Sequence, residues 1–312
     1  MDITTPTTYS KTQVIILGDI ITDVIAHQTE PLVRASDTRT RIAIRAGGSA
    51  ANLATWLATT GVQVHFIGRV GRDPFGFYHQ QELQNSGVTP HLSFDSQLST
   101  GTIVVLVDPA TGERHMLTDR GANRNLALAA VPWELFKPGN CFHLSGYSLL
   151  EAGTRQVALE ALARARQANM VLSVDPSSTS LLQEVGPSQF LDWTHGANIC
   201  FPNLDEGRLL SGENNPAAIA AFLVKWYGEV VLKLGSEGAL WARRNQPYIT
   251  VPALPCQVVD STGAGDAFCA GFLGQWLQGA SPDQALLKGA RLGAEVSGQI
   301  GARPAVDLRD TL

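Results

Sequence analysis

Charged residues are scarce in this sequence, and no segment is rich in lysine and arginine. Charged side chains make up 16% of the 312 residues, and the formal net charge is −5. A nucleic-acid partner needs a basic surface, so this composition argues against one. The hydrophobic content of 44% suffices for a large core, in one large α/β domain or in two domains.

Long hydrophobic runs are also missing. No stretch approaches the roughly 18 consecutive apolar residues of a membrane helix. The first residues, MDITTPTTYSKTQ, carry no apolar segment of the kind found in signal peptides. The four cysteines form no CxxC pair and three lie in apolar runs, which is typical of free buried thiols in a reducing compartment. These absences predict a cytoplasmic protein without a membrane partner.

Several motifs of enzyme families are absent too. The sequence contains no GxxxxGK[ST], which excludes a P-loop mechanism, and no HExxH or GxSxG. Its first apolar segment, residues 14–23, reads VIILGDIITD without the GxGxxG of a dinucleotide-binding turn, so a nicotinamide dehydrogenase is disfavoured. The seven histidines are scattered along the chain, which argues against a histidine-bound metal.

Short apolar runs alternate with amphipathic segments along most of the chain. Buried strands are predicted at VIILG, VHFIG, CFHLSG, MVLSVDP, NICFP and VVLKLG. Helices are predicted over residues 49–61 with Gly61 as C-cap, through 80–83, over 155–168, after Asn203, and over 268–277 and 284–297. This alternation predicts an α/β fold with a mostly parallel sheet flanked by helices.

Two segments interrupt the alternation. Residues 20–46 and 99–121 contain strand-like pieces such as TRTRIAIRA and TGTIVVLVD without intervening helices. Two such ribbons can pair into a small sheet beside the main domain. The pattern leaves open whether this sheet is a mobile lid over a ligand cleft or a rigid extension. We expect a single domain over residues 1–312, with the two segments inserted in it.

The segment DSTGAGDAF places two glycines and an aspartate where a helix begins. Backbone amides near Gly263 and Gly265 can crowd together, and the helix N-terminus adds unpaired N–H groups, which predicts an anion site. Asp266 would compete with the anion for these donors unless it serves as a base beside a phosphoryl group. In that role the helix dipole would favour its ionised form. The simpler alternative is a loop in which Asp266 caps the helix.

Three further stretches combine turn residues with the end of a predicted element. AGGSAAN places two glycines and Asn52 where a helix begins, and GRVGRDPFG is a turn-rich loop after a strand. FPNLDE places Asn203 and Glu206 after a strand end, where ligands collect in open α/β sheets.

Five motifs now stand in order: GGSAANLA, GRVGRDPFG, NLDE, KLGSEG and DSTGAGDAF. Together they resemble the ribokinase-like, or PfkB, carbohydrate kinases, and the match runs from about residue 14 to residue 304. The resemblance implies a ribokinase-like fold with a small β-lid. It also implies a phosphotransferase that uses ATP and Mg²⁺ to phosphorylate a hydroxymethyl group of a sugar or related polyol. Lid-to-lid homodimers are common in the family, so a homodimer through the lid is expected.

The resemblance also assigns roles to residues of this sequence. Asp266 matches the catalytic base, and Gly263, Ala264 and Gly265 match the anion hole. Glu206, together with Asn203, matches the motif that arranges Mg²⁺ and phosphates, often through water. Asp260, with residues 297–302, matches a loop that binds a monovalent cation such as K⁺ in many members. Sugar contacts are implied for Asp23, Gly47, Gly48 and Asn52, and nucleotide contacts for Asn203, Lys233, Gly235, Gly238, Thr262 and Gly265.

The sequence departs from ribokinases proper at one point. They carry an acidic sugar-binding residue soon after the strand that corresponds to CFHLSG, whereas this chain has Tyr147 there, as a substrate contact or as packing. Ribose is therefore not the expected substrate. The motif DRGAN puts Arg120 and Asn123 at the lid base, within reach of the substrate.

Two alternatives to a sugar kinase stay open. One is a nucleoside kinase of the same fold, which would need an aromatic-lined base pocket near the lid. The other is a catalytically silent sugar-binding regulatory protein, which would have no need of the Asp266 base.

Overall fold

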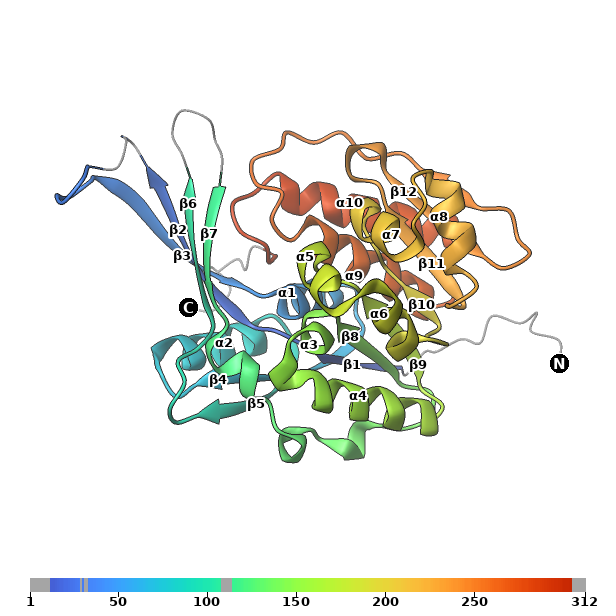
Figure 1. The fold of residues 1–312 in the computed structure, drawn as a ribbon, viewed down its shortest axis with the longest axis horizontal. Helices are drawn as coiled ribbons and strands as arrows, with labels where there is room; N and C mark the ends of the chain where they lie inside the picture. The colour runs from blue at the N-terminus through green and yellow to red at the C-terminus, as the bar shows by residue number, and fades with distance from the viewer. Residues whose placement is uncertain (1–11, 29, 31–32, 108–113, 305–312) are drawn as a thin grey trace.

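The computed structural model describes residues 12–28, 30, 33–107 and 114–304, and its main feature is a nine-stranded sheet (Figure 1). The strand order is β13-β12-β11-β10-β9-β8-β1-β4-β5. All neighbours from β5 to β11 pair in parallel, and only β12 and β13 run antiparallel to their neighbours. The strands are β1 (Gln13–Leu17), β4 (Gln63–Gly71), β5 (Val88–Asp95), β8 (Cys141–Ser145), β9 (Val171–Asp175), β10 (Ile199–Cys200), β11 (Glu229–Lys233), β12 (Ala239–Arg243) and β13 (Ile249–Val251).

Helices cover both faces of this sheet (Figure 1). One buried cluster joins α1, α9 and α10 to the sheet through side chains such as Trp56, Phe66 and Phe272. The other cluster, on the opposite face, includes Phe142, Leu162 and Phe190. The helices are α1 (Ser49–Ala58), α2 (Pro74–Asn85), α3 (Tyr147–Leu150), α4 (Ala152–Gln167), α5 (Thr179–Val185), α6 (Pro187–Thr194), α7 (Leu204–Ser211), α8 (Pro216–Leu223), α9 (Ala264–Leu277) and α10 (Pro282–Ser297).

The α/β fold with a mostly parallel sheet flanked by helices is confirmed, but several element boundaries differ from the prediction. The NICFP strand shrinks to the two residues of β10, because the chain turns at Pro202 into the start of α7. The first helix ends at Ala58 with Thr59 as C-cap, and Gly61 takes a left-handed conformation with φ of 83° beyond it. The elements β5, β12, β13, α3, α5, α6 and α8 were not expected.

The two ribbons pair into a second, four-stranded sheet with the order β3-β2-β6-β7. Its strands are β2 (Ile21–Gln28), β3 (Thr40–Gly47), β6 (Thr102–Val107) and β7 (Arg114–Asp119). The hairpin partners are antiparallel, and β2 pairs with β6 in parallel across the join. This sheet projects away from the large sheet, at the upper left of Figure 1.

Polar residues gather where the central parallel strands end. Asp19 follows β1, Asp175 closes β9, Asn203 follows β10, and Lys233 closes β11. Parallel strands present their carboxyl ends at one edge, so residues far apart in sequence meet there. Cys141, Cys200 and Cys269 are free buried thiols as predicted, whereas Cys256 is exposed. Within the described ranges, no helix has the length and apolar character needed to cross a membrane.

Candidate active site

Two hollows lie at this edge of the large sheet. The first, here named the central cavity, has a volume of about 590 Å³ and is lined by residues of both sheets. The second, the outer groove, has a volume of about 930 Å³ and is lined by segments around α7, β11, α9 and α10. Asn203, Lys233 and Gly265 line both hollows. Ligands in the two hollows would therefore meet at these residues.

The start of α9 stands at this junction. Gly263 is the N-cap with φ of 80°, and a Cβ atom there would lie 2.6 Å from Cβ of Ala302. Only glycine fits that conformation in that space. Ala264 already donates its N–H to the carbonyl oxygen of Ser261 (3.2 Å). Asp266 lies in the first turn of the helix and not at the cap, so the alternative in which it caps the helix is wrong.

Asp266 is half-buried between α9 and α1, with part of its side chain open to the central cavity. Its Oδ1 accepts a hydrogen bond from the Ser49 hydroxyl (2.8 Å), and its Oδ2 accepts one from Nδ2 of Asn52 (2.9 Å). Burial raises the pKa of Asp266 to about 7, with a further contribution from Asp175, while these two donors and Lys233 oppose the rise. The helix N-terminus was expected to stabilise the ionised form of Asp266, but the cost of desolvating that charge is larger. A carboxylate with such a pKa is suited to accept a proton near neutral pH.

An ion pair lies beside this carboxylate. Nζ of Lys233 is 2.6 Å from Oδ2 of Asp175, and the Cys269 thiol lies 3.5 Å from the same oxygen. Burial lowers the pKa of Lys233, but Asp175 and the other acidic neighbours reverse that effect and hold it well above its usual range. Lys233 is therefore a permanent positive charge that faces both hollows.

Asn203 and Glu206 form a capping box at the start of α7. The backbone N–H of Asn203 donates to Oε2 of Glu206 (2.8 Å), and the N–H of Glu206 donates to Oδ1 of Asn203 (2.9 Å). Burial, followed by the charge of Asp175, raises the pKa of Glu206 to about 7. The pair thus stabilises the helix start, and it places a second buried carboxyl group near Lys233.

The loop before α9 is organised around Asp260. Its Oδ1 accepts hydrogen bonds from the backbone N–H (2.9 Å) and the hydroxyl (2.6 Å) of Thr262. Its Oδ2 accepts one from the N–H of Gly301 (3.4 Å). Asp260 is 7% exposed. Asp260 and Thr262 both line the central cavity. Thr262 was predicted to contact the nucleotide, but it is not among the residues that line the outer groove.

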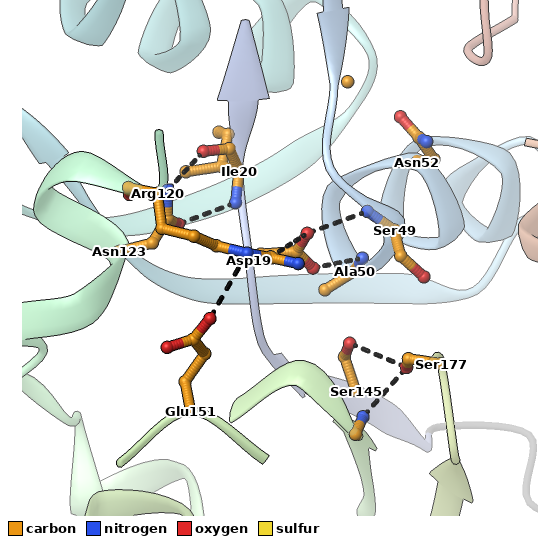
Figure 2. A network of polar contacts seen from close by, with 12 residues as sticks. Asp19, Ile20, Ser49, Ala50, Asn52, Arg120, Asn123, Ser145, Glu151 and Ser177 are labelled. Atoms are coloured by element: carbon orange, nitrogen blue, oxygen red, sulfur yellow. Dashed lines mark hydrogen bonds and ion pairs between the residues drawn. The ribbon is translucent and has the colours of Figure 1, made fainter. Parts of the chain in front are cut away.

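A second polar network lies at the start of α1, beside the central cavity (Figure 2). Asp19 accepts hydrogen bonds from the N–H groups of Ser49 (3.3 Å) and Ala50 (3.2 Å) at the start of α1. Arg120 lies between two carboxylates, 3.4 Å from Asp19 and 3.6 Å from Glu151. Its charge is therefore largely compensated before any ligand binds.

Asn123 stands behind Arg120. Its amide accepts from the N–H of Ile20 (2.9 Å) and donates to the carbonyl oxygens of Ile20 (2.8 Å) and Arg120 (3.1 Å). The side chain is thus engaged with backbone, and Asn123 is not among the residues that line the central cavity. The guanidinium of Arg120 also stacks 4.0 Å from the ring centre of Tyr147, which does line the cavity.

Asp23 extends from β2 into the central cavity. Burial raises its pKa to about 6, although Arg303 opposes the rise. Its carboxylate packs over Gly47, where a Cβ atom would collide with it. Gly48 lines the cavity with φ of 93°, and a Cβ atom there would lie 2.7 Å from the carbonyl oxygen of Asp19. Gly47 therefore lets the chain pass close to the Asp23 carboxylate, and Gly48 lets it pass close to the backbone of Asp19 and Ile20.

The outer groove is bordered by glycines after β11. Gly235 and Gly238 have φ of 61° and 101°, and both line the groove. A Cβ atom on Gly238 would lie 2.7 Å from the backbone nitrogen of Ala253, so the turn requires glycine. The predicted nucleotide residues Asn203, Lys233 and Gly265 line the same groove.

Comparison with known proteins gives one consistent result. The sequence profile described as pfkB family carbohydrate kinase matches residues 11–308. A fructokinase from Salmonella typhimurium is 29% identical over 270 residues, covering 83% of this chain and 82% of its own length.

Solved structures give the same picture. The adenosine kinase from Sinorhizobium meliloti superposes with a TM-score of 0.85 at 25% identity, covering 96% of this chain and 98% of that one. The aminoimidazole riboside kinase from Salmonella enterica, solved with aminoimidazole riboside and an ATP analogue, superposes with a TM-score of 0.80 at 25% identity, covering 96% and 98%.

The sequence reasoning overlooked four residues of this site: Asp19, Ser49, Asp175 and Arg303. Two of them had a usable signal, because Asp19 and Asp175 each directly follow or end a predicted strand, in VIILGD and MVLSVDP. The partners of Ser49 and Arg303 come from distant segments, so no local pattern marks them.

Proposed function

Because the chain belongs to the pfkB family of carbohydrate kinases, we propose that it transfers a phosphoryl group from ATP to a hydroxymethyl group of a sugar or related polyol. The observation that carries this proposal is the position of Asp266. Its carboxylate lines the central cavity, next to the residues that this cavity shares with the outer groove. An acceptor in the central cavity and a nucleotide in the outer groove would face each other across this base.

The residues at the junction fit the requirements of phosphoryl transfer, which depends on positioning and on charge neutralisation. The acceptor hydroxyl would donate its proton to Asp266. Backbone amides of Gly263 and Gly265 and the positive end of α9 would hold the transferring oxygens, whereas the Ala264 N–H would first have to leave the Ser261 carbonyl. Lys233 would neutralise negative charge that develops between the two hollows.

A divalent cation fits the same place. Asp175 and Glu206 are two buried carboxyl groups whose mutual repulsion Lys233 only partly offsets, and a cation would relieve that repulsion. We therefore propose that Glu206, with Asn203, arranges Mg²⁺ and the ATP phosphates. When bound, Mg²⁺ neutralises phosphate charge. Asp260 is also proposed as a ligand of a monovalent cation such as K⁺, because carboxylate oxygens that accept hydrogen bonds keep further lone pairs for a cation.

The walls of the central cavity formed by α1 and the four-stranded sheet fit a polyhydroxylated ligand. Asp19 and Asp23 supply acceptors, while Asn52 supplies an amide beside the base. Arg120 is already paired with two carboxylates, so it offers a ligand little uncompensated positive charge. We infer a neutral sugar or polyol rather than a sugar acid or sugar phosphate.

A nucleoside is the second candidate, and one feature of the cavity favours it. The four-stranded sheet presents an apolar wall, made of Ile25, Ile103, Val105 and Met116, on which a planar base can lie. The structures of an adenosine kinase and of an aminoimidazole riboside kinase are among the similar folds.

The outer face of the four-stranded sheet fits a second copy of the chain. Ile42, Ile44 and Leu117 are 64%, 47% and 60% exposed. The strand registers place them on one face, opposite to the face that lines the cavity. We propose a homodimer through this face. Sedimentation equilibrium should report a dimer for the wild type and a monomer for Ile44→Lys; a wild-type monomer would contradict it.

The test of the proposed function is a direct assay of ADP formation. D-Fructose, D-ribose, a polyol series and adenosine would each be supplied with MgATP, and ³¹P NMR would identify the phosphorylated hydroxymethyl group. Turnover of a neutral sugar with a primary phosphate product is the expected result. Turnover of adenosine alone would favour the nucleoside candidate. Binding of sugars without any ADP formation would instead identify a silent sugar-binding protein.

A further inference from the structure

One neighbour of Asp266 is itself held by a residue from the C-terminal part of the chain. Asn52 donates from Nδ2 to Asp266, while its other amide atom, Oδ1, lies 3.4 Å from Nε of Arg303. Arg303 is 7% exposed, although it follows the last helix by several residues. Burying a guanidinium costs free energy unless its N–H groups form hydrogen bonds, so the partners of Arg303 determine whether the folded chain tolerates it.

Each of the three guanidinium nitrogens of Arg303 has a hydrogen-bond partner. Nη1 donates to Oε2 of Glu82 on α2 (2.7 Å), and Nη2 donates to the carbonyl oxygen of Gly47 at the end of β3 (2.9 Å). The preceding residue is also fixed, because Nε1 of Trp56 donates to the carbonyl oxygen of Ala302 (2.9 Å). The guanidinium therefore has one defined orientation relative to α1.

The chemistry of these groups sets the orientation of the amide between them. The two ends of an asparagine amide have nearly the same shape, so its partners decide which end points where. A guanidinium can only donate and an ionised carboxylate can only accept. Oδ1 of Asn52 must therefore face Arg303, and Nδ2 must face Asp266.

We propose that Arg303 is a positioning residue for phosphoryl transfer, which fixes the Asn52 amide with its donor toward Asp266. The inference rests on the proposed function, in which Asp266 is the base. Without Arg303, only Asp266 would orient the amide, so the Asn52 hydrogen bond to the ionised carboxylate would be weaker and formed less of the time.

This role predicts a specific change in the acidity of the base. Because a donor stabilises the ionised carboxylate, its loss raises the pKa of Asp266 further above its usual range. The hydroxyl of Ser49 would remain as a donor. The other titratable or charged groups that act on Asp266 or feel its charge are Asp175, Lys233, Cys269 and Tyr147, and the substitution leaves them in place.

The experiment compares Arg303→Met with the wild type in two measurements. A ¹³C NMR titration of the aspartate carboxyl groups, with the Asp266 signal assigned by its absence from Asp266→Asn, needs no substrate. A pH–rate profile uses the best acceptor among D-fructose, D-ribose and adenosine. Both should shift upward by about one pH unit, which lowers turnover roughly fivefold at pH 7 and much less at pH 9.

A matched control and a double variant isolate the role of the amide. Arg69→Met removes another partly buried ion pair, with Asp95 (3.0 Å), and should leave the Asp266 titration unchanged. In an Asn52→Ala background, Arg303→Met should add no further shift. The proposal would be overturned if Arg303→Met shifted the Asp266 titration as much in the Asn52→Ala background as in the wild type. It would also be overturned if Arg303→Met shifted the titration in neither background.

A folding failure would not leave the question open. Should Arg303→Met not fold, Arg303→Lys would replace it, since an ammonium group keeps the charge beside Glu82 but cannot reach all three partners. It should shift the titration in the same direction by a smaller amount. Should Asp266→Asn retain full turnover, the proposed base is wrong, whereas the NMR titration still decides the Arg303 inference by itself.

Discussion

The two ends of the central cavity are built by different means. At the end near α9, the groups are backbone amides, a half-buried carboxylate and a buried ion pair, all on elements of the large sheet and its helices. At the other end, an apolar wall and Asp23 come from the projecting four-stranded sheet. Phosphoryl transfer needs fixed geometry, whereas acceptor recognition varies between substrates. The comparison suggests that chemistry and selectivity reside in separate parts of this fold.

The largest expected effect is at the α9 end. Asp266→Asn should lower turnover by about 10²–10⁴, the usual range for loss of a general base, and should leave ATP affinity unchanged. Asp283→Asn is the matched control, because Asp283 also lies in the first turn of a helix, α10, and is exposed. Steady-state assays with calorimetry of ATP binding provide the measurement. Near-normal turnover in Asp266→Asn would show that the α9 end of the cavity does not supply the base.

At the acceptor end, Asp23→Ala should act on binding and not on the chemical step. A charged hydrogen bond contributes about 1.5–3 kcal/mol, so the affinity for the acceptor should fall by roughly 10–150-fold per bond lost. Asp37→Ala, an exposed aspartate in the connection between β2 and β3, is the control. Calorimetry should show that ATP affinity is retained. Parallel losses of both affinities would indicate a structural role for Asp23.

The pH dependence of turnover sharpens the comparison further. Since burial raises the pKa of Asp266 to about 7, kcat/KM should fall as the pH drops below 7, as the base becomes protonated. Stability should respond in the opposite sense. A carboxyl group with a raised folded-state pKa costs stability as the pH rises from about 4 to about 7, because the unfolded chain ionises first.

That cost would be absent from Asp266→Asn. Its stability relative to the wild type should therefore increase between pH 4 and pH 8, measured by urea unfolding. A pH-independent difference between the two proteins would show that Asp266 is not perturbed by burial.

The smallest expected effect concerns motion of the four-stranded sheet. We propose that an acceptor sugar orders both ribbons, 20–46 and 99–121, because closure would exclude water from the transferring phosphoryl group. Hydrogen exchange should slow in both ribbons together with the substrate, and less with ATP alone. A response in only one ribbon would mean that they do not move as one lid. Unchanged exchange in both, with a substrate that is turned over, would identify a rigid extension.

Local sequence signals predicted the glycine-rich helix start because its residues are contiguous. DSTGAGDAF brings the glycines and Asp266 to one helix start without any help from distant segments. Other assignments were less direct. Asn123 and Gly47 were expected to contact the substrate. The side-chain amide of Asn123 instead bonds to the backbone of Ile20, and Gly47 packs beneath the Asp23 carboxylate. A sequence motif identifies a residue, but it does not show which neighbours form hydrogen bonds with that residue in the folded chain.

The sequence by itself determined the alternation of strands and helices, the glycine-rich helix start and the family. These properties depend on periodicity and on backbone conformation, which are local. Only the tertiary structure decided the environment of Asp266. Asp266 meets Ser49 and Asn52 from a segment more than 200 residues earlier, and Arg303 reaches Asn52 from the other end of the chain. Burial, and with it the raised pKa of Asp266, arises only when the folded chain excludes water from that carboxylate.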